Sequence, residues 1–110
     1  CAECSVRHVP GIEELRQFNL DSLPPQGVFQ GTGCAACRKT GYRGRFALSE
    51  LLVMNEEIRD HVQARANASQ ILQAAQRSGM RLMREDGLEK VLSGRTTLDE
   101  VARVTVNATL

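Results

Sequence analysis

The sequence has no tryptophan and few other aromatic residues, which together make up 4% of its 110 residues. Its core must therefore be built mainly from aliphatic side chains, methionine and alanine. No apolar run approaches the roughly 20 residues of a transmembrane helix, and the opening residues, CAECSVRHVP, lack the apolar stretch of a signal peptide. A net charge of +1 gives no histone-like basic excess. What remains is the composition of an ordinary globular chain, with 42% hydrophobic and 25% charged residues.

The motifs of common enzyme families are missing as well. The sequence contains no GxxxxGK[ST] phosphate loop, no GxGxxG, no HExxH and no GxSxG. The two histidines, His8 and His61, stand in no recognisable nucleophile pattern. We interpret the acidic residues at 85–86 and 99–100 as helix-end charges rather than as a general acid and base. The sequence therefore predicts no catalytic residue in this chain.

The chain does contain four cysteines, arranged as two C-x-x-C pairs. Cys1 and Cys4 form CAEC, Cys34 and Cys37 form CAAC, and residues 5–33 separate the pairs. Two intervening residues allow a tight turn to direct both thiolates at one tetrahedral metal ion, so two such pairs complete a Cys4 site. We interpret the site as structural zinc, because four protein ligands leave no position for a catalytic water.

Other uses of four cysteines are less favoured by the sequence but stay open. Disulfides would require an oxidising compartment, of which the sequence gives no sign. A redox C-x-x-C usually follows a strand in a βαβ unit, and haem attachment needs a histidine where Ser5 and Arg38 stand. An iron–sulfur cluster would use the same four thiolates. The spacer is longer than in most zinc ribbons, so we expect a folded segment within it.

A basic loop, residues 38–45 (RKTGYRGR), follows the second cysteine pair and contains no acidic residue. Its candidate contact residues are Arg38, Lys39, Tyr42, Arg43 and Arg45. The cations can offset the formal −2 charge of a zinc tetrathiolate. Alternatively, they can contact nucleic acid, with the tyrosine stacking on a base, or bind another anion or a partner protein. The near-zero net charge of the chain disfavours nucleic acid.

Hydrophobic periodicity predicts an α+β fold that is mainly α-helical. We expect a small Cys4 zinc module with short strands and an inserted helix over residues 1–45. A strand and a four-helix C-terminal subdomain then occupy residues 46–110. The helices are expected at 12–19, from 55, at 69–77, at 84–93 and from 97, with strands at 27–31 and 45–54. Pro24 and Pro25 are expected to interrupt regular structure, and the terminal TVNATL is expected to fray.

The predicted strand at 45–54 (RFALSELLVM) is apolar on both faces, as in a strand buried within a larger sheet. Residues 27–31 are its only plausible partner in this sequence. This mismatch indicates a missing neighbour, either another subunit or an absent part of the same protein. A carboxylate on such a strand needs a partner, and we expect an arginine beside Glu50.

Two stretches resemble the C-terminal region of the hexameric ATPases that drive type II secretion and type IV pilus assembly. The first is GCAACRKTGYRGRFALSELL, which is similar to the family pattern GCxxC, TGYxGR and an acidic ELL or EVL strand. The second is GMRLMREDGLEKVLSGRTTLDEVARVT, which resembles the closing segment of the same family. The resemblance covers essentially the whole chain.

The resemblance implies that Cys1, Cys4, Cys34 and Cys37 are the zinc ligands of the family's tetracysteine motif. It also implies that the chain is a fragment, with the ATP- and Mg²⁺-binding core upstream and the 45–54 strand lying against that core. Such ATPases work at the cytoplasmic face of the inner membrane. They contact neighbouring subunits of a hexamer and the cytoplasmic parts of membrane-anchored secretion or pilus proteins.

Overall fold

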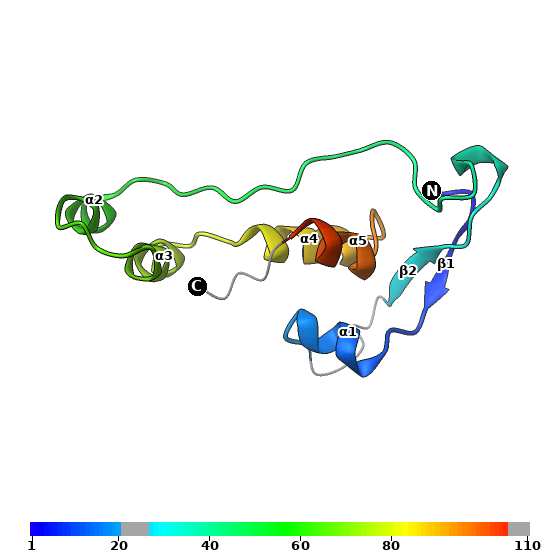
Figure 1. The fold of residues 1–110 in the computed structure, drawn as a ribbon, viewed down its shortest axis with the longest axis horizontal. Helices are drawn as coiled ribbons and strands as arrows, with labels where there is room; N and C mark the ends of the chain where they lie inside the picture. The colour runs from blue at the N-terminus through cyan, green and yellow to red at the C-terminus, as the bar shows by residue number, and fades with distance from the viewer. Residues whose placement is uncertain (21–26, 106–110) are drawn as a thin grey trace.

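The computed structural model describes residues 1–20 and 27–105, and it confirms a mainly helical α+β fold (Figure 1). The elements follow in the order β1 (Ser5–His8), α1 (Ile12–Gln17), β2 (Val28–Gly31), the 3-10 helix η1 (Ala35–Cys37), α2 (Glu56–Gln63), α3 (Ala68–Arg77), α4 (Met83–Leu92) and α5 (Leu98–Val104). The predictions for Pro24, Pro25 and residues 106–110 lie outside the described residues. None of the described helices is both long and apolar enough to span a bilayer.

Helix boundaries follow the capping signals in the sequence. The Asn55 side chain accepts a hydrogen bond from the Ile58 amide at 2.8 Å and caps α2. Thr97 Oγ1 accepts one from the Glu100 amide at 3.1 Å and caps α5. The Glu100 carboxylate pairs with Arg103. Both helices therefore begin where the sequence predicts, from 55 and from 97.

The two short strands form an antiparallel sheet, and α1 lies in the connection between them. Ser5 pairs with Gly31 and His8 pairs with Val28. The strand near residues 27–31 is confirmed, whereas β1 was not predicted, because its four residues are mostly exposed and show no clear apolar alternation. Cys4 directly precedes β1, so this pairing brings the two cysteine pairs to the same end of the sheet (Figure 1).

Two separate apolar clusters hold the described residues together. The larger contains Phe18, Val28, Val91, Leu98 and Val101, and it packs α1 and β2 against α4 and α5. The smaller joins α2 to α3 through Ile58, Ala74 and Ala75. The larger cluster contains residues from both expected domains, 1–45 and 46–110. The boundary between these domains stays a prediction.

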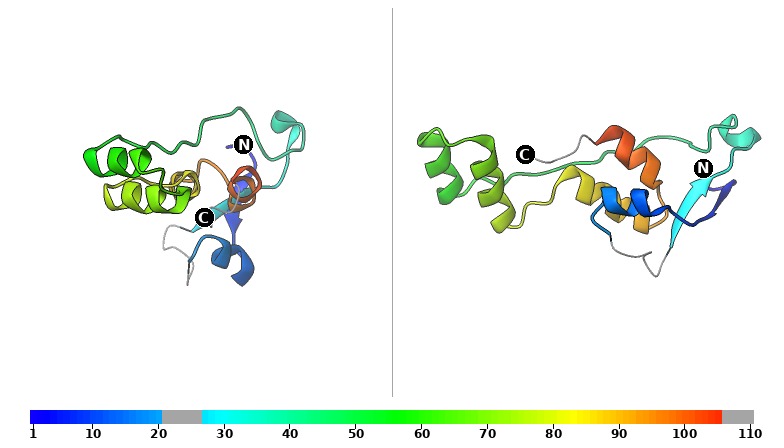
Figure 2. Two further views of the ribbon diagram at one scale, coloured as in Figure 1. Left: turned by 60° about the vertical axis from the view of Figure 1, so that its left-hand side comes forward. Right: turned by 60° about the horizontal axis from the view of Figure 1, so that its bottom comes forward.

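The chain is elongated: the α2–α3 pair, which forms the smaller cluster, lies away from helices α4 and α5 of the larger one (Figure 2). Its extents are 55 × 29 × 19 Å and its radius of gyration is 17.1 Å. A compact chain of this length has a radius of gyration of about 13 Å. The α2–α3 pair lies at one end and the cysteine-rich turns lie at the other (Figure 1).

The expected strand at 45–54 is absent: these residues are extended but belong to no sheet. Among the described residues the sheet contains only β1 and β2, so the expected pairing of 45–54 with residues 27–31 does not form. The expectation of an arginine beside Glu50 is also corrected. Glu50 Oε2 accepts a hydrogen bond from the Met83 amide at 2.9 Å, at the first residue of α4.

Candidate metal centre

The β1–β2 pairing continues into the cysteine turns and fixes their relative position. The Thr32 amide donates to the Cys4 carbonyl at 3.1 Å, and the Thr32 hydroxyl donates to the same oxygen at 3.2 Å. At the chain start, the Cys1 ammonium donates to the Gly41 carbonyl at 2.8 Å. These bonds hold the first cysteine pair against the turn that carries the second.

The four thiol sulfurs form one group, all within 4.8 Å of one another. The Sγ–Sγ distances are 3.7 Å for Cys1–Cys34, 3.7 Å for Cys34–Cys37 and 3.8 Å for Cys4–Cys37. In a tetrahedron with Zn–S bonds of about 2.3 Å, the sulfurs are about 3.8 Å apart. The thiols are free cysteines rather than disulfides. The group therefore has the size of a tetrathiolate metal site.

Backbone amides point at the sulfurs, as expected around thiolates. The Gly33 amide donates to Cys4 Sγ at 3.3 Å, and the amides of Cys34 and Gly41 donate to Cys37 Sγ at 3.3 and 3.2 Å. Burial opposes ionisation of Cys37, but hydrogen bonds from these two amides and from the Cys34 and Cys4 thiols together lower the pKa of its thiol to about 6. The surroundings of Cys37 thus favour the charged form that a metal binds. At Cys34, by contrast, a backbone hydrogen bond is outweighed by burial and by the Cys37 thiol, so the pKa of its thiol is raised.

The second cysteine turn depends on left-handed backbone and on glycine. Arg38 and Lys39 have φ of 54° and 64°, and Gly41 has φ of 85°. Gly41 also lies against Gly31: a Cβ on Gly31 would be 2.4 Å from the Gly41 carbonyl oxygen. Gly31 thus allows the two backbones to approach each other, a role that no motif in the sequence indicates.

The donor set fits zinc. Soft thiolate ligands and a tetrahedral arrangement select zinc or an iron–sulfur cluster rather than magnesium or calcium. Cys4 and Cys37 are buried, and Cys1 and Cys34 are partly buried. Bound zinc would link the first turn to the second, and four thiolates leave no open coordination position for catalysis.

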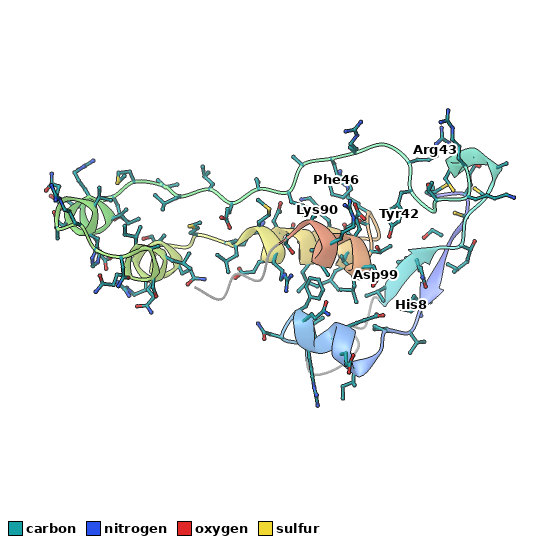
Figure 3. All side chains as sticks on the ribbon, viewed as in Figure 1. His8, Tyr42, Arg43, Phe46, Lys90 and Asp99 are labelled. Atoms are coloured by element: carbon teal, nitrogen blue, oxygen red, sulfur yellow. The ribbon has the colours of Figure 1, made fainter. Side chains whose placement is uncertain are left out.

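The basic loop lies beside this centre and is anchored at its tyrosine. The Tyr42 hydroxyl and Thr97 Oγ1 are 2.6 Å apart, which joins the loop to the N-terminus of α5 (Figure 3). The loop's four cations are exposed, and none forms an ion pair with another described residue. Arg95, which the sequence analysis did not single out, lies 4.6 Å from the centre of the Phe46 ring at the end of the loop.

The fold and the thiol group define a mainly helical chain with a tetracysteine centre, and comparison with known sequences gives its family. The model of the family described as "Type II/IV secretion system protein" matches residues 1–103. The chain belongs to this family, as the resemblance predicted.

Its relatives come from both secretion and pilus systems. The type IV pilus assembly ATPase PilB of Thermus thermophilus is 44% identical over 108 residues, which cover 96% of this chain. Type II secretion system protein E of Xanthomonas campestris is 46% identical over 105 residues, or 93% of this chain. The type II secretion system ATPase E of Vibrio cholerae is 32% identical over 105 residues, or 96% of this chain. The chain spans only 12%, 18% and 21% of these relatives, respectively.

Proposed function

We propose that this chain is the zinc-binding, C-terminal accessory region of a hexameric ATPase that powers type II secretion or type IV pilus assembly. The observation that carries the proposal is the 3.7–3.8 Å spacing of the sulfurs, in a chain whose relatives are named as ATPases of these systems. The zinc is structural. Cys1 and Cys4 fix the first turn, Cys34 and Cys37 fix the second, and the metal joins them.

ATP hydrolysis would belong to the remainder of such a protein, because this sequence contains no phosphate loop. ATP and Mg²⁺ would bind in an upstream core at the cytoplasmic face of the inner membrane. The partners of this chain would be that core, neighbouring subunits of the hexamer and the cytoplasmic parts of inner-membrane proteins. We expect the chain alone to show no ATPase activity above background in a phosphate-release assay. Hydrolysis by the chain alone would contradict this division.

Removing the metal tests the structural role of zinc. We expect chelation or Cys34→Ser to abolish amide protection around β1, β2 and residues 32–41, because the two turns lose their common anchor. Helices α2 and α3 should keep their protection, since their cluster contacts neither turn. Hydrogen exchange measures both regions in one experiment, with the exposed neighbour variant Ala35→Ser as the control. Equal loss in both regions, or no response to chelation, would overturn the proposal.

The exposed cations of the basic loop favour one alternative function, a zinc module that binds single-stranded nucleic acid. In that case, affinity would fall steeply with salt and would be lost in the Arg43→Ala, Arg45→Ala double variant. The proposed function predicts no such salt-dependent binding. Fluorescence anisotropy with a labelled oligonucleotide distinguishes the two functions.

A further inference from the structure

The turn that carries Cys34 and Cys37 is closed by hydrogen bonds between residues that are near neighbours in the sequence. The Lys39 amide donates to the Cys34 carbonyl at 2.7 Å, and the Thr40 amide donates to the Cys37 carbonyl at 3.1 Å. The Thr40 hydroxyl donates to the same Cys37 carbonyl at 2.7 Å. Two more bonds end on a sulfur, since the Cys34 and Gly41 amides both donate to Cys37 Sγ. The turn therefore contains its own supports for the thiols that it carries.

The first cysteine pair is supported differently, from across the sheet. The Cys4 carbonyl accepts from the Thr32 amide and from the Thr32 hydroxyl, and Cys4 Sγ accepts from the Gly33 amide. The Cys1 nitrogen donates to the Gly41 carbonyl. Each of these partners lies 28 or more residues further along the chain. These bonds therefore form only when β1 lies beside β2.

This difference in sequence separation decides which half of the site forms more easily. Cys34 and Cys37 are 3 residues apart, whereas Cys4 and Cys37 are 33 residues apart. The chance that two points of a flexible chain meet falls roughly as the 3/2 power of their separation, so the local pair is favoured more than about tenfold. The β1–β2 sheet does not offset this difference, because two strands alone are marginal in water and β1 is mostly exposed.

One threonine supports each half of the site. The Thr40 hydroxyl donates to the Cys37 carbonyl and accepts from the Tyr42 amide at 3.1 Å. The Tyr42 hydroxyl in turn bonds at the N-terminus of α5, so Thr40 joins the second turn to the helices. In the first half, the Thr32 hydroxyl donates to the Cys4 carbonyl. Each of the two threonines is exposed and bonds the carbonyl of one buried cysteine.

We propose that the Cys34–Cys37 turn takes the metal first and that Cys1 and Cys4 complete the site afterwards, as β1 pairs with β2. Thr40 is then the positioning residue of the half that acquires the metal. This inference rests on the proposed function, which places zinc at the four thiols. Release follows the reverse path, so the metal leaves after the first cysteine pair has opened.

Thr40→Val and Thr32→Val form a matched pair of variants, because each removes one hydroxyl at an exposed position and keeps the branching at Cβ. Stopped-flow mixing of the reduced, metal-free chain with cobalt(II) measures the loading rate, since the visible absorption of cobalt(II) reports thiolate coordination. Losing a hydrogen bond that is already formed in the rate-limiting step slows that step about fivefold. We therefore expect Thr40→Val to load about fivefold more slowly, and Thr40→Ser to restore the rate.

Thr32→Val should behave in the opposite way, because its hydrogen bond forms after the rate-limiting step. It should load cobalt(II) at the wild-type rate and lose the metal to a chelator about fivefold faster. Equal loading rates for Thr40→Val and Thr32→Val would overturn the proposal. Slower loading of Thr32→Val alone, or a Thr40→Ser variant as slow as Thr40→Val, would also overturn it.

Cys4→Ser and Cys37→Ser test the same order at equilibrium, because both cysteines are buried and each variant keeps the other three thiols. Cys4→Ser retains the acquiring half, so it should bind cobalt(II) at least about tenfold more tightly than Cys37→Ser. With metal bound, Cys4→Ser should protect the amides of Lys39 and Thr40 from hydrogen exchange, whereas Cys37→Ser should not. Protection of α2 and α3 in both variants is the internal control for folding. Equal affinities, or tighter binding by Cys37→Ser, would overturn the proposal.

The wild-type chain separates this proposal from the proposed function. Metal bound by four sulfur atoms, together with equal behaviour of the paired variants, would remove the order of loading and leave the zinc-binding function standing. A reduced wild-type chain that takes up neither zinc nor cobalt(II) would remove the proposed function, and the order of loading with it.

Discussion

The close approach of Gly31 to Gly41 predicts that Gly31→Ala disrupts the metal centre. The added Cβ would lie 2.4 Å from the Gly41 carbonyl oxygen and 2.7 Å from its Cα. Both contacts are to backbone, so no side chain can rotate away. The Gly41 backbone is also held by two hydrogen bonds. Its amide donates to Cys37 Sγ at 3.2 Å, and its carbonyl accepts from the Cys1 ammonium. Relief of the clash must therefore move one cysteine turn relative to the other.

The cost follows from these contacts. Overpacking in a well-packed site costs about 1–3 kcal/mol, and loss of one of the two hydrogen bonds at Gly41 adds roughly 1 kcal/mol. We therefore expect Gly31→Ala to lower the free energy of unfolding of the zinc-loaded chain by about 3 kcal/mol. At roughly 4 °C per kcal/mol for a domain of this size, the melting temperature falls by about 12 °C. Gly31→Ala should also lose zinc to a competing chelator at lower chelator concentrations than the wild type does.

Gly11→Ala is the matched control, because no atom lies within 4 Å of a Cβ at that position. Gly11 is the N-cap of the short helix α1, and its φ of −71° is open to any residue. Gly11→Ala should therefore change the free energy of unfolding by less than about 1 kcal/mol. Thermal unfolding of the zinc-loaded proteins by circular dichroism compares the two variants. Equal melting temperatures for Gly31→Ala and Gly11→Ala would refute the close-approach reasoning.

Three further predictions concern the α4–α5 region. A hydrogen bond from the Ser49 amide, together with the nearby cations of Lys90 and Arg81, holds the pKa of Asp86 below its ordinary value. Asp86 therefore stabilises the fold above about pH 4, so acid titrations of wild type and Asp86→Asn should converge as pH falls through the lowered pKa. Gly87→Ala should destabilise by about 1–2 kcal/mol in urea unfolding, since its Cβ would lie 2.5 Å from Val101 Cγ1. Tyr42→Phe loses the bond to Thr97 and should cost about 1 kcal/mol with unchanged zinc content.

The helices were the most predictable part of the fold, because their signals are local. Asn55 and Thr97 lie where capping residues are expected, and both accept the expected amide hydrogen bonds. Gly79 and Gly94 follow the helices α3 and α4 with φ of 101° and 80°, which favours glycine after a helix end.

The non-local features were harder to predict. Strand β1 depends on its pairing with β2 rather than on its own mostly exposed residues. The expectation of a strand at 45–54 was wrong for this chain, because an apolar pattern makes a strand only where another strand pairs with it, and no described strand does so here. The cysteine spacing indicated one shared site, whereas the approach of Gly31 to Gly41 follows from the folded turns alone.

X-ray absorption at the zinc edge, with the metal content of the purified chain, tests the central claim most directly. The account predicts one zinc ion per chain, bound by four sulfur atoms at about 2.3 Å, and loss of this signal in Cys34→Ser. A chain that is purified without metal and with its cysteines in disulfides would contradict it, as would a zinc ion with nitrogen or oxygen ligands.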